Sequence, residues 1–183
     1  MPRLYMVRHG KAAAGFGESM DPGLDALGKV QASEVAARLR PLGPLSIISS
    51  PLARARETGA ALAKLWNHEP AIEPAVAEIP SPTDNLQDRA AWLRKFMAGG
   101  WHDATPHLTT WREAAISTLL AQREDTVIFS HYIAINVAAG FAERDDRVVV
   151  FSPDNCSVTI LDVRDGKLYL VEKGHEAALT KVN

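Results

Sequence analysis

Two stretches of the sequence share one pattern, LYMVRHG at residues 4–10 and TVIFSH at residues 126–131. In each, an apolar run rich in strand-forming residues ends at a histidine, which predicts a buried β-strand followed by a loop. Ligands of open α/β sheets bind beyond the carboxyl ends of the strands, so His9 and His131 are expected to share one pocket. Either histidine alone would be read as a hydrogen-bonded structural residue, and the pairing makes them candidates for a functional site.

Outward from the first strand, helical and extended patterns alternate. Asp25 precedes a segment of helical spacing as its N-cap, and Pro51 suits the first turn of a second helix that runs to about Trp66. A longer helical pattern over residues 84–122 is broken at Gly99-Gly100 and at Pro106. The other expected elements are strands over 4–7, 45–48 and 126–130, an extended segment over 71–77, and helices over 25–40 and 133–139.

The end of the chain has a different order, because strand patterns follow one another without a helix between them. We expect strands over residues 148–151, 158–161 and 167–171, with Asp165-Gly166 as the hairpin turn of the last pair. Alternating strands and helices followed by consecutive strands predict an α/β domain with a mixed, mostly parallel sheet and an antiparallel edge.

Length and composition predict one soluble, folded domain. The 183 residues suffice for a core that needs no disulfide or metal. Twenty basic and 22 acidic side chains give a net charge of −2, so no nucleic-acid or membrane partner is expected. The lone Cys156 has no partner for an internal disulfide, which favours a reducing compartment. Without a signal-peptide core or an apolar run of about 20 residues, we expect a cytoplasmic protein.

Arginines accompany both the first histidine and the second strand. Arg8 precedes His9, and the stretch SSPLARARET at residues 49–58 places Arg54 and Arg56 at the start of a helix. Guanidinium groups and backbone amides that converge on a helix N-terminus match the oxygens of a phosphoryl group. Taken alone, the stretch would be read as a solvated helix face with ordinary charge pairs.

Four motifs together resemble those of the histidine phosphatase superfamily, the phosphoglycerate-mutase-like proteins, and in particular its phosphatase branch. They are RHG at residues 8–10, LDALGKVQA at 24–32, which resembles the family's L-T-x-x-G-x-x-Q-A, SPLARARET at 50–58, and SH at 130–131. They occur in the family's order over about residues 3–161. The resemblance implies a three-layer αβα fold, with residues 1–183 forming a single domain that carries a helical cap insertion at about 80–122.

The resemblance also implies a role for each site residue. His9 would be the nucleophile that becomes phosphorylated, while Arg8, Arg54 and His131 would bind the phosphoryl oxygens. An imidazole among cations has a lowered pKa, which keeps the attacking nitrogen neutral near pH 7. Fixed positive groups then stabilise the charge of the transferring group, and neither role requires a metal or another cofactor.

The family also uses an acidic residue as general acid, located between the second strand and the late histidine. Glu78 is the best candidate, since it follows an extended segment and precedes the rigid turn of residues 79–82. Asp84 and Asp88 are alternatives. A loop carboxylate that faces water is the competing interpretation for Glu78.

Several residues depart from the family's pattern. Lys11 stands where glutamate or glutamine commonly follows RHG, and Tyr132 where glycine often follows the second histidine. Lys11 and Arg56 add positive charge near the expected pocket and favour a substrate with more than one anionic group, unless both face solvent. The cap contains Trp92, Trp101 and Trp111, which either line the mouth of the site or pack the insertion onto the sheet.

These observations predict a metal-independent phosphatase that acts on a small phosphorylated metabolite or a phosphoprotein. A phosphoglycerate-type mutase is the alternative among enzymes of this family. A zinc hydrolase using His9, His131 and Glu78 is a third interpretation, which His102 and His107 do not support because they lack the i,i+4 spacing of a helical metal motif. A module that binds phosphorylated partners without catalysis is a fourth. The sequence leaves the oligomeric state open.

Overall fold

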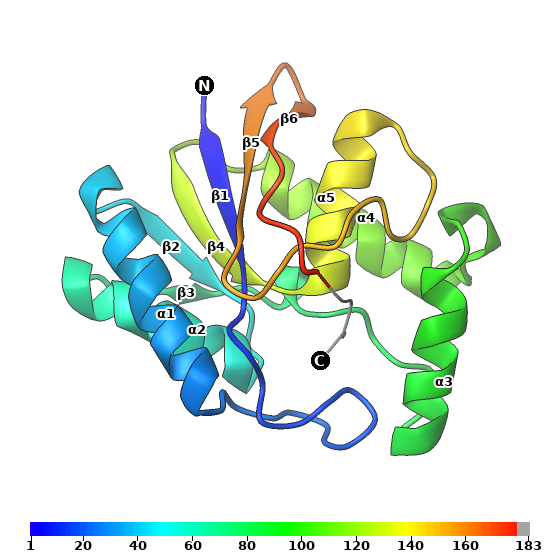
Figure 1. The fold of residues 1–183 in the computed structure, drawn as a ribbon. Coiled ribbons are helices and arrows are strands. Elements are labelled where there is room, and N and C mark those ends of the chain that lie inside the picture. The colour runs from blue at the N-terminus through cyan, green and yellow to red at the C-terminus, as the bar shows by residue number, and fades with distance from the viewer. Residues whose placement is uncertain (179–183) are drawn as a thin grey trace.

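A single six-stranded sheet with helices on both faces forms the protein (Figure 1). The computed structural model describes residues 1–178. The strand order is β3-β2-β4-β1-β5-β6; the first four strands in this order are parallel, whereas β5 and β6 run antiparallel at one edge. The predicted mixed sheet is therefore confirmed. The strands are β1 (Arg3–Arg8), β2 (Ser46–Ser49), β3 (Ala71–Ile72), β4 (Thr126–Ser130), β5 (Val158–Arg164) and β6 (Lys167–Glu172).

The helices form the outer two of the three layers. Helices α1 and α2 cover one face of the sheet, where Leu62 packs with Val7 and Phe129. Helices α4 and α5 cover the other face, where Ile135 packs with Ile128. Strands buried on both faces account for the unbroken apolar runs in the sequence. The helices are α1 (Ala26–Leu39), α2 (Ala53–Trp66), α3 (Leu86–Met97), α4 (Pro106–Leu120) and α5 (Tyr132–Glu143), and short 3₁₀ turns occupy η1 (Arg40–Leu42), η2 (Pro74–Val76) and η3 (Trp101–Asp103).

Helix starts follow the sequence signals in one case and not in the other. Asp25 is the N-cap of α1, since its carboxylate accepts from the backbone N–H of Gly28 at 2.7 Å. The prediction that Pro51 lies in the first turn of α2 is wrong, because α2 begins at Ala53. The carboxylate of Asp21, from the loop after β1, accepts from the Ala53 N–H at 2.8 Å and so caps α2 from outside the helix.

The segment predicted to be extended over residues 71–77 is extended only at β3. Pro74 begins the 3₁₀ turn η2, and the Glu73 carboxylate caps this turn by accepting from the Ala75 N–H at 3.0 Å. This turn redirects the chain toward the carboxyl end of β4, where the Ser130 hydroxyl donates to the Val76 carbonyl at 2.7 Å. The redirection places residue 78 beside the end of the sheet.

Residues 148–151 are not a strand, contrary to the sequence prediction. Asn136 of α5 supplies the hydrogen-bond acceptor that a neighbouring strand would supply. Its side-chain oxygen accepts from the backbone N–H groups of Val150 and Phe151 at 2.8 and 3.1 Å. The apolar composition of this segment reflects burial against α5 rather than pairing in the sheet. The predicted turn at Asp165-Gly166 is confirmed, and both residues have the positive φ that a two-residue hairpin requires.

The helical segment between η2 and β4 carries the aromatic cluster. Trp92 stacks on Phe96 with ring centroids 5.6 Å apart, Phe96 contacts the edge of Trp101 at 5.4 Å, and Trp101 lies 6.2 Å from Trp111. These contacts favour the interpretation that the tryptophans pack this segment together. Within the part of the chain that the structure describes, no helix is long and apolar enough to cross a membrane.

Candidate active site

The two histidines of the repeated pattern lie together beyond the carboxyl ends of β1 and β4. Their ring centroids are 5.2 Å apart, and neither residue is exposed to solvent. Residues Arg8, Arg54 and Glu78 lie around them and are also buried, with at most 7% of their surface exposed. All five residues expected from the sequence are therefore gathered at one end of the sheet.

The hydrogen bonds of His9 define which ring nitrogen has a free electron pair. Because the Gly10 carbonyl can only accept, the Nδ1 of His9 carries the proton and donates to it at 2.7 Å. The opposite nitrogen, Nε2, accepts from the Nε–H of Arg54 at 3.2 Å. Burial, then the charges of Arg54 and Arg8, hold the pKa of His9 well below its ordinary value. The ring is therefore a neutral imidazole with a nucleophilic Nε2.

One hydroxyl connects the loop of His9 to the helix of Arg54. Thr58 accepts from the Gly10 N–H at 3.0 Å and donates to the Arg54 carbonyl, one turn earlier in α2, at 2.7 Å. Gly10 itself packs against α1, and a Cβ there would lie 2.6 Å from the Gly28 carbonyl oxygen. This close packing and the Thr58 hydrogen bonds fix His9 relative to Arg54.

The two arginines of the site are buried cations. Arg8 donates through Nη1 to the Pro153 carbonyl at 2.9 Å, and its guanidinium lies 5.1 Å from the centre of the Tyr132 ring. Burial lowers the pKa of both Arg8 and Arg54, and the charge of Glu78 opposes this shift. Tyr132, which departs from the family's glycine, is therefore a support for Arg8. Two guanidinium groups beside a neutral imidazole present donors that match the oxygens of a phosphoryl group.

His131 offers a second imidazole to the same space. Its Nε2 is hydrogen bonded to the Ser50 hydroxyl at 2.7 Å, and this hydroxyl also accepts from the Leu52 N–H at 3.2 Å. Among residues 1–178, no hydrogen-bond partner is found for the buried Nδ1 of His131. Burial, followed by the charges of Arg54, His9 and Arg8, lowers the pKa of His131 well below its ordinary value. When the Ser50 hydroxyl donates to Nε2, Nδ1 carries a proton for a ligand oxygen.

Glu78 lies at the N-terminus of α5 and not in solvent. Its carboxylate accepts from the Ile79 N–H at 3.0 Å and from the Ile133 N–H at 3.2 Å. Burial raises its pKa, against the opposing effects of these bonds and of Arg54 and Arg8. A carboxyl group that keeps its proton above the usual pH range suits a general acid. The alternatives Asp84 and Asp88 are both exposed.

A comparison with known families accords with this geometry. Residues 4–175 match the model of the histidine phosphatase superfamily (branch 1). The chain belongs to this superfamily. Among curated proteins, a probable phosphoglycerate mutase, GpmB, from an Enterobacter species is 27% identical over 192 residues, which cover 90% of this chain and 86% of that protein.

Solved structures of two phosphatases share the fold. A mutant phosphoserine phosphatase of Entamoeba histolytica, in complex with phosphoserine, matches with a TM-score of 0.73 and 23% identity, over 94% of this chain and 96% of that chain. A mycobacterial glucosyl-3-phosphoglycerate phosphatase in complex with VO3 matches with a TM-score of 0.73 and 21% identity, over 97% and 100%. These similarities show that the chain has the same fold as these two proteins.

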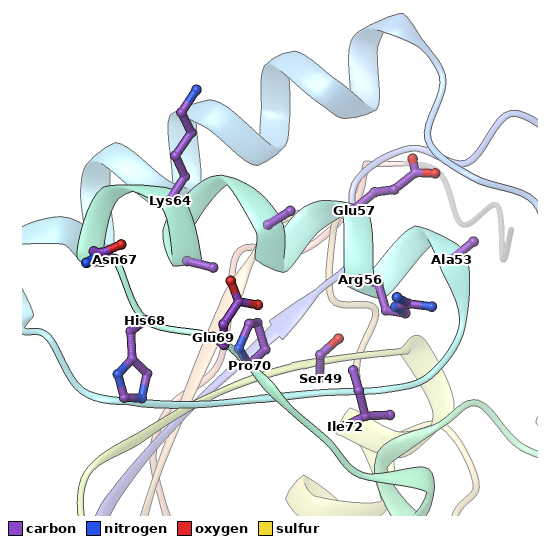
Figure 2. Close-up of a pocket in the computed structure, with 12 residues that line it drawn as sticks. Ser49, Ala53, Arg56, Glu57, Lys64, Asn67, His68, Glu69, Pro70 and Ile72 are labelled. Carbon is purple, nitrogen blue, oxygen red and sulfur yellow. The ribbon is translucent and has the colours of Figure 1, made fainter.

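Two further basic residues named from the sequence, Lys11 and Arg56, are exposed. The Lys11 ammonium forms an ion pair with Asp25 at 3.3 Å on the surface. Arg56 lines a groove of about 780 Å³ between α2 and residues 67–72, as Figure 2 shows, and none of the five candidate site residues lines this groove. The inference of a multiply charged substrate from Lys11 and Arg56 is therefore not supported by their positions.

The sequence did not identify the loop that precedes β5 as a support of the site. Asn155 donates from its side chain to the His9 carbonyl at 3.0 Å, and Cys156 donates from its backbone N–H to the Arg8 carbonyl at 2.9 Å. With Pro153, whose carbonyl accepts from Arg8, this loop holds the Arg8-His9 pair through hydrogen bonds. No local signal in the sequence identifies it, because its role depends on the antiparallel β5 lying beside β1. Cys156 is buried, which raises the pKa of its thiol to about 12 and makes it inert.

The residues proposed as zinc ligands are arranged differently. Over the described residues 1–178, no three His, Cys, Asp or Glu side chains form a group that could hold a metal ion. In His9 both ring nitrogens have protein partners, and the Glu78 carboxylate accepts from two backbone N–H groups. These side chains are held by hydrogen bonds within the protein, and their arrangement does not resemble a set of metal ligands.

Proposed function

We propose that this protein is a metal-independent phosphatase that hydrolyses a phosphomonoester of a small metabolite or of a phosphoprotein, through a phosphohistidine formed on His9. The observation that carries the proposal is the neutral His9, whose Nε2 electron pair faces the Arg54 guanidinium. A nucleophile among cations attacks a dianionic phosphoryl group without first losing a proton.

In the first step, His9 Nε2 forms a bond to phosphorus as the ester P–O bond breaks. The Nε–H of Arg54 then donates to a phosphoryl oxygen instead of to His9 Nε2. Arg8 and His131 bind the remaining oxygens. The leaving oxygen takes the electron pair of the broken bond and a proton from Glu78. The products of this step are an alcohol and phosphohistidine.

In the second step, water replaces the alcohol. The Glu78 carboxylate accepts a proton from water as the water oxygen bonds to phosphorus. The N–P bond breaks, its electron pair returns to Nε2, and phosphate leaves. Glu78 thereby regains the proton that it gave to the leaving oxygen, and no metal takes part in either step.

A phosphoglycerate-type mutase is a second candidate, favoured by the name of the curated relative described above. A mutase returns the phosphoryl group of phosphohistidine to the bound product, so it interconverts isomers and releases little phosphate. Incubation with 2- or 3-phosphoglycerate distinguishes the two activities. We expect phosphate release that exceeds isomer interconversion, and the reverse result would favour the mutase.

Trapping of the intermediate tests the proposal directly. Brief incubation with a ³²P-labelled phosphomonoester should give acid-labile, base-stable label on the parent protein and none on His9→Gln, with both proteins folded by circular dichroism. Turnover should persist in excess chelator. A folded His9→Gln variant that retains activity would refute the role of His9, and binding of phosphate without turnover in the parent would indicate a non-catalytic module.

A further inference from the structure

Helix α3 contains a buried cation that the proposed mechanism does not use. Arg89 is 6% exposed, and its guanidinium lies 4.0 Å from the centre of the Phe16 ring. Its Nη1 lies 2.9 Å from the sulfur of Met20, a weak acceptor, and its buried Nε has no hydrogen-bond partner within residues 1–178. Within the described residues, the buried Nε–H therefore lacks an acceptor and Nη1 meets only a thioether, an incomplete set of partners for a buried charge.

Acidic residues do not neutralise Arg89 in the described part of the chain. Asp84 is the carboxylate whose charge acts on the pKa of Arg89, but it is exposed and forms no ion pair with the guanidinium. A buried guanidinium without a carboxylate partner is costly in a folded protein, and an anionic ligand removes that cost.

The loop of residues 10–24, between β1 and α1, connects Arg89 to the phosphate-binding site. Figure 1 shows this loop extending toward α3. Contact is close at Gly17, where a Cβ would lie 2.8 Å from the Cβ of Ala90. Next to Met20 in this loop, Asp21 accepts from the N–H of Ala53, the residue before Arg54. The charge of Arg89 also lowers the pKa of Arg54, as expected for two cations near one space.

We propose that Arg89 binds a second anionic group of the substrate, a carboxylate or a phosphate, while Arg8 and Arg54 bind the phosphoryl group that is transferred. The inference rests on the proposed function and narrows it to phosphomonoesters that carry another oxyanion. Arg89 presents forked donors that match the paired oxygens of either group. It thereby takes the role that the sequence suggested for Lys11 and Arg56.

The variant Arg89→Met tests the proposal, because methionine retains an apolar stem against Phe16 and removes the charge. The exposed Arg94, on the same helix, provides the control Arg94→Met. kcat/KM is measured on 3-phosphoglycerate, on fructose 1,6-bisphosphate and on glycerol 2-phosphate, which lacks a second anion. Loss of one charged hydrogen bond predicts a decrease of about 10- to 100-fold on a doubly anionic substrate, mainly through KM.

The pattern across substrates decides the outcome. A selective loss on 3-phosphoglycerate identifies a carboxylate, a selective loss on the bisphosphate identifies a phosphate, and glycerol 2-phosphate should be hydrolysed as by the parent. Equal losses on all three substrates, or no loss on any, would overturn the proposal. If the parent hydrolyses none of them, the proposed function fails, and calorimetric binding then tests Arg89 alone: weaker binding of 3-phosphoglycerate but not of inorganic phosphate to Arg89→Met supports the inference, and unchanged binding overturns it.

Discussion

The Nε–H of Arg54 donates to Nε2 of His9 across 3.2 Å, so a buried cation lies against the electron pair that attacks phosphorus in the proposed mechanism. Burial and the charges of Arg54 and Arg8 keep the imidazole neutral, and the hydrogen bond points the Nε2 electron pair at the Arg54 guanidinium. A phosphoryl group that enters between the two residues exchanges this hydrogen bond for a N–P bond and a charge-assisted contact to oxygen.

Removal of the Arg54 guanidinium should lower the catalytic rate far more than removal of the nearby Arg56 guanidinium. Arg54→Ala should lower kcat/KM on p-nitrophenyl phosphate by about 10² or more, because a donor to transition-state charge is lost. Arg56→Ala should leave the rate near that of the parent, since Arg56 lines the groove between α2 and residues 67–72, which no candidate site residue lines. Steady-state kinetics of both variants provide the measurement.

The same variant should change the ionisation of His9. Loss of the adjacent cation raises the pKa of His9 toward its ordinary value, which an NMR titration of the ring measures. A greater loss of activity in Arg56→Ala than in Arg54→Ala would contradict the placement of α2 beside the nucleophile.

The stability of the fold should fall on acidification because of the two buried histidines. Both His9 and His131 have pKa values well below the ordinary value of 6.5, mainly through burial. Below about pH 6.5 the unfolded chain binds protons that the folded chain does not, so the free energy of unfolding decreases by about 1.4 kcal/mol per pH unit for each histidine. Urea denaturation between about pH 7.5 and pH 5.5 measures this slope.

The double variant His9→Gln/His131→Gln provides the comparison, since glutamine does not titrate. Its free energy of unfolding should depend less on pH over this range than that of the parent. The exposed His68→Gln should retain the parent's dependence. Equal slopes for the double variant and the parent would show that the two imidazoles are protonated in the folded protein.

Local patterns predicted the residues at strand ends and could not predict their tertiary supports. His9 and His131 each follow an apolar run, and this signal is contained in a few neighbouring residues. Asn155 and Pro153 contact the Arg8-His9 pair from far along the chain, and that contact exists only because β5 pairs with β1. Arg89 was part of an ordinary helical pattern, and only its burial distinguishes it from Arg94, the other arginine of α3.

Residues 148–151 were predicted to form a strand, and in the structure Asn136 accepts from their backbone instead. This hydrogen bonding gives a prediction about Asn136. Asn136→Leu should lower the free energy of unfolding by about 1–3 kcal/mol or more, because the buried N–H groups of Val150 and Phe151 lose their acceptor. Urea denaturation measures the loss, and hydrogen exchange of these two amides should accelerate selectively. Unchanged exchange at both amides would show that another acceptor replaces Asn136.

The contribution of Glu78 to the rate should increase with the basicity of the leaving oxygen. An alkyl alkoxide needs a proton as its P–O bond breaks, whereas a nitrophenolate does not, so a general acid contributes roughly 10²- to 10⁴-fold for alkyl esters only. Glu78→Gln keeps the size of the side chain and its carbonyl acceptor but has no acidic proton. It should lower kcat strongly on glycerol phosphate and slightly on p-nitrophenyl phosphate.

In the parent, the rate on glycerol phosphate should decline as pH rises through the raised pKa of Glu78, and this decline should be absent in Glu78→Gln. Controls are Asp84→Asn and Asp88→Asn, which change exposed carboxylates. Equal losses of Glu78→Gln on both substrates would indicate a structural role, and a larger loss in either control would transfer the acid function to that aspartate.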